Sequence, residues 1–468
     1  MLRKLMPLRK LSLFVLVSAV SLFAATPRTM RLDYYHTGND HSELFSMGDV
    51  VLEPLPWPGN LSKTIDDTNL GKYYFEVRDR ATNKLLYSRG FASIFGEWET
   101  TDEAHEISRT FSESLRFPAP EHPVQIILKK RDDQNAFREL WTINIDPNDK
   151  FIDRAIGQPP APLLKLQYSG DSPTHVDLLL LGDGYTAAES AKFEKDAHRL
   201  MDLLFNTSPF KEHRSDFNVW GMCPPAEQSG ISRPSQGIYR HSPLGTTYDA
   251  FGSERYVLSF DNRAFRNIAQ FAPYEFVEII TNSKTYGGGG IFNLYSTVAA
   301  DSLWAPYVFV HEFGHHFAGL ADEYFTSDVA YLPPTKRVEP WEPNVTALLD
   351  PKELKWRDLV TPGTPIPTPW DQAGYMQYSR EVQAERHKIR AENQPESVMD
   401  ALFEQEKKHE DDLLDHDKYS GKVGAFEGAN YEAKGYYRPQ ENCIMFTRYN
   451  KFCAVCQRAI ERIIGLYT

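Results

Sequence analysis

The sequence has no excess of basic residues. Lysine and arginine number 51 against 64 aspartates and glutamates, which gives a formal net charge of -13. Nucleic acids and anionic membrane surfaces are bound by proteins with the opposite balance, so we expect neither as a partner. Hydrophobic residues make up 41% and charged residues 25% of the chain, as in ordinary globular proteins. The 468 residues are enough for two or three domains.

Long hydrophobic runs are missing from all but the first residues. The apolar run 11–23 follows a basic stretch and precedes Ala24 and Ala25, which is the pattern of a secretory signal peptide. It is shorter than the ~20 residues of a membrane span, no cysteine near the cleavage point could carry a lipid, and no later segment is apolar enough to cross a bilayer. We expect residues 1–25 to be a signal peptide and the mature protein to be exported, periplasmic or extracellular, with no membrane anchor.

Cysteine is scarce, with Cys223, Cys443, Cys453 and Cys456 the four in the chain. Export favours disulfides over free thiols. Four cysteines allow three pairings, and the sequence does not choose between them. A four-cysteine zinc site is the less favoured alternative.

Three kinds of ligand-binding loop are also missing. The turn 182–185 is rich in glycine, but it lacks the lysine of a phosphate-binding loop and the glycine spacing of a dinucleotide-binding loop. We interpret it as a tight turn into a helix that begins at a capping box formed by Thr186 and Glu189. No loop has the Asp/Asn spacing of a calcium site.

Hydrophobic periodicity divides the chain into two parts. Short alternating segments predict an antiparallel β-sandwich over residues 26–147, whose role the sequence leaves open. A proline-rich stretch, 148–170, predicts a linker. Strands and helices then alternate, which predicts an α/β domain over residues 171–468. Within it, a highly charged segment at about 371–420 predicts a solvated helical insertion.

The expected strands are 50–57, 73–78, 85–91, 107–117, 124–129 and 140–145 in the first part, and 176–181, 217–222, 275–281 and 291–299 in the second. The last of these follows a run of glycines, residues 287–290, that we expect to form a sharp turn. We expect 291–299 to be an edge strand beside the next helix, where it could pair with an extended peptide substrate.

The strongest chemical signal is His311-Glu312-x-x-His315. Two histidines four residues apart lie on one face of a helix, so both imidazoles can reach one zinc ion at about 2.0–2.1 Å. Glu312 is then placed to take a proton from water that the metal has acidified. The short motif could recur by chance on a surface helix. However, the apolar segment 304–310 precedes it, with Pro306 near the helix start, and this predicts a buried helix.

A zinc enzyme of this kind needs a third protein ligand. In a continuous helix Asp322 would lie seven residues, roughly 10 Å, past His315 and out of reach. Gly319 can end the helix in the left-handed conformation and turn the chain back. Asp322 or Glu323 could then reach the metal; we favour Asp322 but leave Glu323 open. His316 points off the ligand face, and we expect it to be packed or to support the site.

The motifs together resemble a known family. HEFGHHFAGLADEY, preceded by GDGYTAAE and YGGGG and followed by NCIMF and FCAVC, looks like the bacterial IgA-peptidase family of zinc metallopeptidases, which is grouped with the metzincins. The resemblance covers most of the chain from about residue 176 onwards, and the upstream β-domain is similar to the family's N-terminal domain. It implies a metzincin-like catalytic domain.

Carried over to this chain, the resemblance makes His311 and His315 zinc ligands, Glu312 the general base, Asp322 the third ligand and Met445 the residue of the methionine turn. One departure concerns the third ligand: the wider metzincin pattern has its glycine three residues and its third ligand six residues after the second histidine, one fewer than here. The metzincin tyrosine is also displaced. Tyr449 lies four residues after Met445, so no oxyanion role is assigned to it.

The sequence therefore predicts a secreted zinc metalloendopeptidase that acts on a protein or peptide substrate. Two alternatives remain: a zinc amidase that acts on cell-wall peptides, and a non-catalytic extracellular binding protein with a degenerate zinc site. The intact Glu312 speaks against the second, since a binding protein has no need of a general base. The natural substrate, the cleavage specificity and the oligomeric state are left open.

Overall fold

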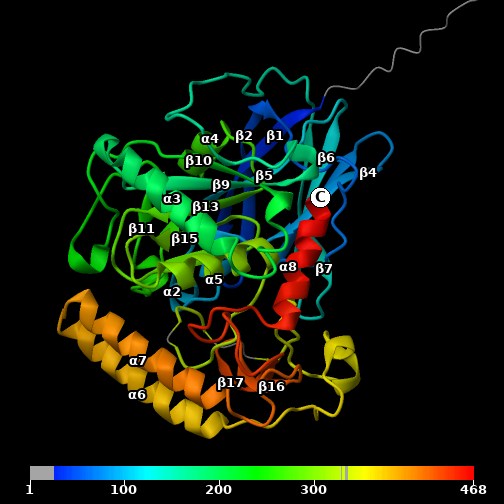
Figure 1. Ribbon diagram of the computed structural model, residues 1–468. Coiled ribbons are helices and arrows are strands. Elements are labelled where there is room, and N and C mark those ends of the chain that lie inside the picture. Colours follow the sequence, from blue (N-terminus) through cyan, green and yellow to red (C-terminus); the bar gives the residue numbers. More distant parts are fainter. Residues whose placement is uncertain (1–25, 328, 333–335) are drawn as a thin grey trace, which may run out of the picture.

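The computed structural model describes residues 26–327, 329–332 and 336–468 (Figure 1). The expected signal peptide, residues 1–25, lies outside these ranges. A search of the described helices finds none that is long and apolar enough to cross a membrane.

The N-terminal part consists of two antiparallel sheets that share one hydrophobic core. One has the strand order β2-β1-β5 and is formed by β1 (Arg28–Gly38), β2 (Glu43–Pro56) and β5 (Arg109–Pro118). The other has the order β4-β3-β6-β7 and is formed by β3 (Tyr73–Asp79), β4 (Leu85–Phe91), β6 (Val124–Arg131) and β7 (Phe137–Ile145). Two short helices lie between β4 and β5, namely α1 (Ile94–Trp98) and α2 (Asp102–Glu106). This part is β-rich, as predicted.

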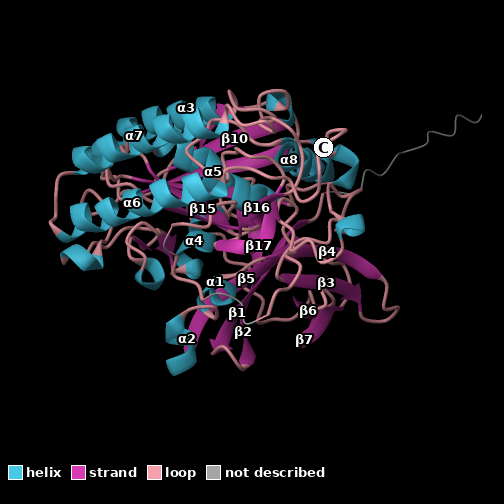
Figure 2. Cartoon of the chain, turned by 90° about the horizontal axis from the view of Figure 1, so that it is seen from below, coloured by secondary structure: helices cyan, strands magenta, loops and turns pink. Residues whose placement is uncertain are grey.

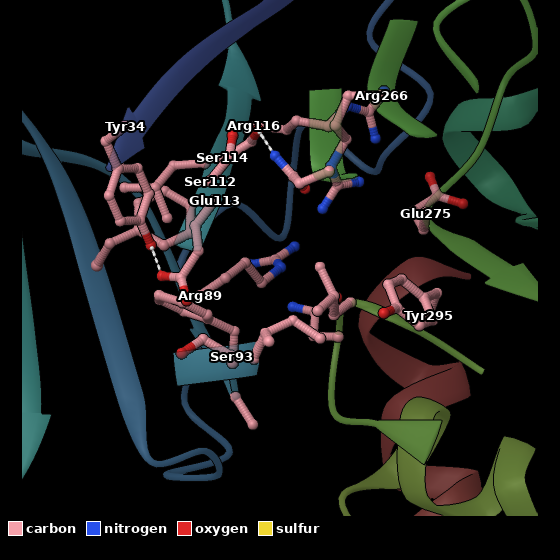
Figure 3. A pocket seen from close by; sticks show the side chains of 18 of the residues that line it. Tyr34, Arg89, Ser93, Ser112, Glu113, Ser114, Arg116, Arg266, Glu275 and Tyr295 are labelled. Atoms are coloured by element: carbon pink, nitrogen blue, oxygen red, sulfur yellow. Dashed lines mark hydrogen bonds between the residues drawn. The ribbon is translucent and has the colours of Figure 1, made fainter. Parts of the chain in front are cut away.

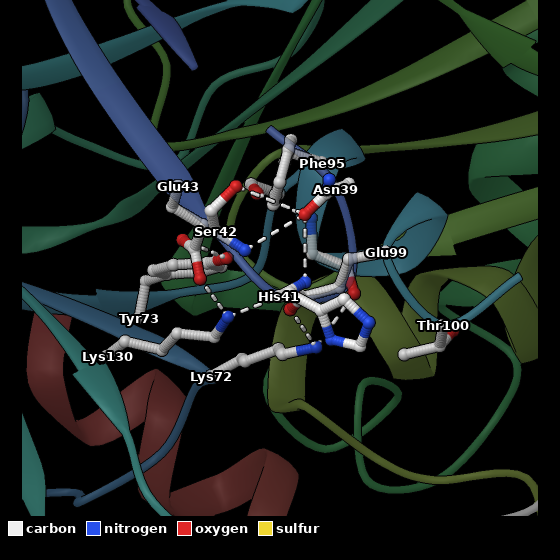
Figure 4. A network of polar contacts seen from close by, with 12 residues as sticks. Asn39, His41, Ser42, Glu43, Lys72, Tyr73, Phe95, Glu99, Thr100 and Lys130 are labelled. Atoms are coloured by element: carbon white, nitrogen blue, oxygen red, sulfur yellow. Dashed lines mark hydrogen bonds and ion pairs between the residues drawn. The ribbon is translucent and has the colours of Figure 1, made fainter. Parts of the chain in front are cut away.

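A network of buried and half-buried charges ties this domain together around Glu43 (Figure 4). Glu43 accepts hydrogen bonds from Lys130, from the hydroxyl of Tyr73 at 3.2 Å and from His36 Nε2 at 2.9 Å. Lys130 also bonds Glu99 at 2.7 Å. Burial raises the pKa of the Glu43 carboxyl, but His36 and Lys130 outweigh it and lower that pKa to about 2. Glu43 is therefore ionised at neutral pH, next to His36 and Lys130.

The C-terminal part is built on a mixed sheet with the strand order β14-β15-β13-β9-β10-β8 (Figure 1). Its strands are β8 (Leu164–Gln167), β9 (Val176–Asp183), β10 (Phe217–Met222), β13 (Phe276–Thr281), β14 (Gly288–Ile291) and β15 (Tyr295–Ala299). The inner strands pair in parallel and the two edge strands are antiparallel. Every residue of β9, β10, β13 and β15 is buried, as expected for strands covered on both faces.

The helix that carries the histidine motif, α5 (Ala305–Ala318), lies at the centre of this part. It packs against β13, β14 and β15 and against α3 (Ser190–Leu204) and α8 (Ala454–Tyr467). The turn before α3 contains the predicted capping box, in which the backbone N–H of Thr186 donates to Glu189 at 2.9 Å. A further helix, α4 (Asn262–Ala269), contacts β5 of the N-terminal domain.

The remaining α-helices and strands of the described chain are one helix pair and two short strand pairs. The charged segment holds two helices that pack together, α6 (Gln372–Ala391) and α7 (Glu396–Leu414) (Figures 1 and 2). A hairpin of β16 (Phe426–Ala429) and β17 (Glu432–Arg438) follows them, and β11 (Thr246–Thr247) pairs with β12 (Leu258–Ser259). The insertion is not wholly solvated: Phe403 of α7 packs on Tyr286 and Trp304, beside the start of α5.

The expectation that residues 291–299 form an edge strand is wrong. β15 is an inner strand, and the edge is β14, which is the glycine run that we expected to be a turn. The reason is steric. A Cβ on Gly290 would lie 2.3 Å from the carbonyl oxygen of Glu312 and 3.0 Å from His315 Cβ. Glycine is needed here because the strand backbone lies directly against α5, a role in which glycine does occur within strands.

Gly290→Ala is therefore expected to force α5 away from β14 and to destabilise the protein by about 1–3 kcal/mol. The matched control is Gly465→Ala in α8, where a Cβ would meet nothing within 4 Å. That change should be neutral or should stabilise by about 0.5–1 kcal/mol, since alanine is the better helix former. Urea unfolding of the two variants and the wild type measures both effects. Equal stabilities of the two variants would contradict the close approach.

The two domains meet at a cavity of about 70 Å³ (Figure 3). Tyr34, Glu113 and Arg116 line it from the N-terminal domain, and Arg266 and Glu275 line it from the C-terminal domain. The Arg116 guanidinium stacks over the ring of Tyr274 at 3.6 Å and donates to its carbonyl oxygen at 3.1 Å. The segment expected to be a linker also contributes β8, which pairs with β10. The N-terminal domain is thus packed onto the C-terminal part rather than tethered to it.

Candidate metal centre

Helix α5 presents the two motif histidines to the same point. Pro306 lies in its first turn, and Gly319 ends it in the left-handed conformation with φ of +60°. The N–H of Gly319 donates to His315 O at 3.0 Å, and the N–H of Leu320 donates to Gly314 O at 3.4 Å, which closes the helix end. The predicted reversal of the chain at Gly319 is confirmed, and it returns the next residues to the histidines.

Three ligand-type atoms converge at this point. The Nε2 atoms of His311 and His315 are 3.2 Å apart. Asp322 Oδ1 lies 3.1 Å from the first and 3.2 Å from the second. This oxygen is buried, and within the described residues it accepts no other hydrogen bond. The structure thus brings together the two motif histidines and the favoured acidic residue.

The backbone fixes how the two imidazoles are oriented. His311 Nδ1 donates to Ile444 O at 2.9 Å, and His315 Nδ1 donates to Leu320 O at 2.6 Å. A carbonyl oxygen can only accept, so each Nδ1 carries the proton and each neutral ring has its lone pair on Nε2. Both lone pairs therefore point at the shared site, which is the arrangement found around metal-bound histidines.

The electrostatics of the site favour a positive charge beside Asp322. The adjacent imidazoles hold the pKa of the Asp322 carboxyl well below its usual range, although burial acts in the opposite direction. Burial lowers the pKa of His315, but Asp322 outweighs it and raises that pKa to about 10. A positive charge at this point is thus strongly favoured, and either a proton or a metal ion can supply it.

The two acidic candidates face different ways. The second oxygen of Asp322 accepts a hydrogen bond from the hydroxyl of Tyr431 at 2.6 Å. Glu323, the next residue, turns away from the histidines: its Oε1 accepts from Asn344 Nδ2 at 2.9 Å and lies 3.4 Å from Cys456 Sγ. Of the pair, Asp322 is the one beside the imidazoles.

Glu312 lies beside the same point. A carboxylate oxygen of this half-buried residue and a ring nitrogen of each histidine all lie within 4.8 Å of one another. Burial raises the pKa of the Glu312 carboxyl, while His311 and His315 act to lower it. The carboxyl can therefore hold or release a proton next to the site.

Met445 packs against the turn of α5 that lies between His311 and His315. It is fully buried, and a Cβ on Gly314 would lie 3.1 Å from its sulfur. Its carbonyl oxygen accepts a hydrogen bond from the backbone N–H of Glu323 at 2.8 Å. The carbonyl oxygen of the preceding residue, Ile444, accepts one from His311 Nδ1. The segment around Met445 therefore supports both the helix and the acidic segment that returns to it.

His316 is packed within the fold, as expected. Its Nε2 accepts the backbone N–H of Val277 at 3.0 Å, and its Nδ1 donates to Ile291 O at 3.1 Å. Burial lowers its pKa to about 3, so the ring stays neutral. It joins α5 to β13 and β14.

Tyr449 is half-buried, near the end of α7. Burial raises its pKa, and the carboxylates that add to the effect are Asp415 and Asp411, which lie at the end of α7.

The expected disulfides are not formed: all four cysteines are free, and Cys223 does not lie with the other three.

Several tyrosines that the sequence does not single out lie around the site. Tyr431 bonds Asp322 from the turn between β16 and β17, where it holds φ of 66°. Its backbone N–H donates to Tyr324 O at 3.0 Å, and Asn430 N donates to Asp322 O at 3.0 Å, so this turn clamps the acidic segment. Tyr307 lies on α5, one turn before His311 and 3.3 Å from its Nδ1. Of these tyrosines, only Tyr307 could have been found from the sequence, because it lies four residues before His311 and therefore on the same face of the helix.

A small polar cavity of about 30 Å³ adjoins these tyrosines. Its lining includes Tyr307, Tyr324, Arg255, Glu406 and Arg448. Glu406 belongs to α7, so the helical insertion forms one wall of the space next to the site.

Two family models match the chain. The model described as IgA Peptidase M64 matches residues 164–464, which is more than half of the chain, and the model described as Peptidase M64 N-terminus matches residues 23–142. No curated protein matches the chain closely enough for comparison. The chain therefore belongs to the IgA peptidase M64 family and is a metallopeptidase, a hydrolase of peptide bonds with an N-terminal β-rich domain ahead of its peptidase domain.

Proposed function

We propose that the protein is an exported zinc endopeptidase in which His311, His315 and Asp322 hold the zinc ion and Glu312 is the general base. One observation carries the proposal: three lone-pair atoms, from two buried residues and the half-buried His315, converge with separations of 3.1–3.2 Å. Ligands 2.0–2.1 Å from a tetrahedral zinc ion are about 3.4 Å apart, close to these separations. Without a cation these atoms would repel one another.

The donor set fits zinc better than other common ions. Two imidazoles and one carboxylate are ligands that zinc accepts, whereas calcium and magnesium prefer oxygen alone. Three protein ligands leave a fourth position for water or substrate, as a catalytic site requires. The hydrogen bonds to Ile444 O, Leu320 O and the Tyr431 hydroxyl hold each ligand in place and support its basicity.

Zinc, when bound, supplies a Lewis acid that polarises the scissile carbonyl and acidifies water. The chain's own part is proton transfer. Glu312 takes a proton from the attacking water and passes it to the leaving amine as the peptide bond breaks. Burial raises the pKa of this carboxyl, which helps it to hold the proton between the two steps. Met445 packs beneath α5 as the methionine-turn residue, and we assign no role to Tyr449.

The family assignment favours a peptidase over a non-catalytic binding protein. The predicted signal peptide supports export, and the substrate is then a protein or peptide outside the cytoplasm. An amidase that acts on cell-wall peptides would share the same metal site, so substrate assays must separate the two functions.

A chelation experiment with two substrates tests the proposed function. The purified mature protein is incubated with a mixture of quenched fluorescent peptides and, separately, with cell-wall fragments. We expect cleavage within the peptides, loss of activity with 1,10-phenanthroline and recovery with added zinc. Activity on cell-wall fragments alone would establish the amidase instead, and peptide cleavage that is insensitive to chelation would exclude the zinc mechanism.

A further inference from the structure

A second cluster of metal-ligand side chains lies behind the candidate metal centre. It consists of Glu323, Cys443, Cys453 and Cys456, all 0–3% exposed. Glu323 follows Asp322 directly, and Cys443 lies two residues before Met445. Cys453 caps the N-terminus of α8, and Cys456 lies in the first turn of that helix. Three separate segments of the chain thus meet at one buried point.

The separations match a tetrahedral zinc site. Cys443 Sγ and Cys456 Sγ are 3.9 Å apart, and Glu323 Oε1 lies 3.4 Å from Cys456 Sγ and 3.9 Å from Cys453 Sγ. All four ligand atoms lie within 4.8 Å of one another. With zinc–sulfur bonds of about 2.3 Å and zinc–oxygen bonds of about 2.1 Å, tetrahedral geometry puts sulfurs about 3.8 Å apart and sulfur and oxygen about 3.6 Å apart.

Backbone N–H groups and a helix N-terminus face this cluster. The backbone N–H of Cys453 donates to Cys443 Sγ at 3.2 Å, and that of Cys456 donates to Cys453 Sγ at 3.4 Å. The N-terminus of α8, with its positive dipole end, points at the cluster. Glu323 Oε2 is buried and has no hydrogen-bond partner in the described structure. Burying a carboxylate oxygen costs free energy unless a hydrogen bond or a cation satisfies it, and a metal ion at this point would do so.

Neither a disulfide nor a site made of all four cysteines fits this geometry. A disulfide needs sulfurs about 2.0 Å apart, whereas the sulfurs of Cys443 and Cys456 are 3.9 Å apart and all four cysteines are free. The four-cysteine site considered from the sequence fails because Cys223 lies elsewhere, against Gly182. Its place in the cluster is taken by Glu323. The spacing Cys453-x-x-Cys456, with Cys443 ten residues earlier, is typical of structural zinc sites.

We propose that Glu323, Cys443, Cys453 and Cys456 bind a second zinc ion whose role is structural. Four protein ligands close the coordination shell, so no position remains for water or substrate. The ion cross-links the Asp322–Glu323 segment, the loop before Met445 and the start of α8. The backbone bond from Glu323 N to Met445 O, 2.8 Å long, joins two of the same segments. The second zinc thereby holds in place the two segments that complete the first site.

Metal analysis and cobalt substitution of the full-length mature protein test this site independently of catalysis. We expect two zinc ions per wild-type chain and one in His311→Ala, which keeps the second site. After exchange into Co²⁺, both proteins should show near-ultraviolet sulfur-to-cobalt charge-transfer absorption, because only the second site contains thiolates. Cys456→Ser should lose that absorption and one metal ion, whereas the control Cys223→Ser should lose neither.

The His311→Ala protein decides the question even if Cys456→Ser does not fold. Folded His311→Ala that takes up no metal and shows no thiolate absorption would overturn the proposal. So would iron in place of zinc, or an unreduced, metal-free wild-type mass lower by two hydrogens, which identifies a disulfide. None of these results bears on the catalytic site, whose failure would appear instead as an equal metal content of wild type and His311→Ala.

Discussion

Glu312→Gln should lower kcat for peptide cleavage by about 10²–10⁴-fold and leave the metal content unchanged. Glutamine keeps the size and hydrogen-bonding shape of the side chain but cannot accept the proton of the attacking water. Since Glu312 is not among the three converging ligand atoms, the metal site should stay intact. Turnover of the peptide mixture and zinc content, measured on the same preparation, report the two effects separately.

The matched control for this variant is Glu194→Gln, an exposed glutamate on α3 that should behave as wild type in both measurements. Glu312→Gln that retains near-normal kcat would refute the general-base assignment. Loss of zinc from Glu312→Gln would also count against it, because the residue would then be holding the metal rather than moving a proton.

Asp322→Ala should remove one zinc ion per chain at ordinary metal concentrations and reduce activity by more than about 100-fold. Loss of groups that merely support a ligand already costs 10–100-fold in metal affinity, so loss of the ligand itself should cost more. The change also leaves the Tyr431 hydroxyl without its acceptor. The two histidine Nε2 atoms, 3.2 Å apart, would then face each other without the negative charge of Asp322 beside them. Zinc titration against a competing chelator measures the affinity directly.

Asp412→Ala, at an exposed position on α7, is the control for this change and should keep full zinc content. Glu323→Gln gives the decisive comparison, because the sequence left Glu323 open as third ligand. In the structure Glu323 faces the cysteines, so its change should weaken the thiolate site and leave the histidine site filled. If instead Glu323→Gln empties the histidine site and Asp322→Ala does not, the assignment of the third ligand is wrong.

The metal-ligand residues of the candidate site could be predicted from the sequence because they lie close together along the chain. Helical spacing places His311 and His315 together, and Gly319 allows the return to Asp322, all within twelve residues. Tyr431 could not be predicted, since it reaches Asp322 from 109 positions further on. That contact depends on how the β16–β17 turn packs, which no local pattern records.

The fold was predictable where burial follows a simple period. In β5, Phe111, Leu115 and Phe117 alternate with more exposed residues, and the strand was expected. β1 was missed because its buried positions include Arg31 and Asp33, which pair with each other at 2.9 Å inside the domain. Charged residues at buried positions hide the hydrophobic pattern of a strand.

The members of the cysteine cluster could not be predicted from the sequence. Counting cysteines led to disulfides or to a site made of all four, because the count carries no information on which residues meet in space. The structure separates Cys223 from the others and supplies a carboxylate, Glu323, as the fourth group. The same pair of adjacent acidic residues thus serves two neighbouring sites, with Asp322 turned to one and Glu323 to the other.

The most direct test of the catalytic metal centre is the zinc content of the purified mature protein, measured for wild type beside His311→Ala. We expect one zinc ion per chain fewer in the variant, whatever the occupancy of the cysteine site. Equal zinc contents in two well-folded proteins would contradict it, because His311 would then hold no metal and the catalytic role of α5 would have no basis.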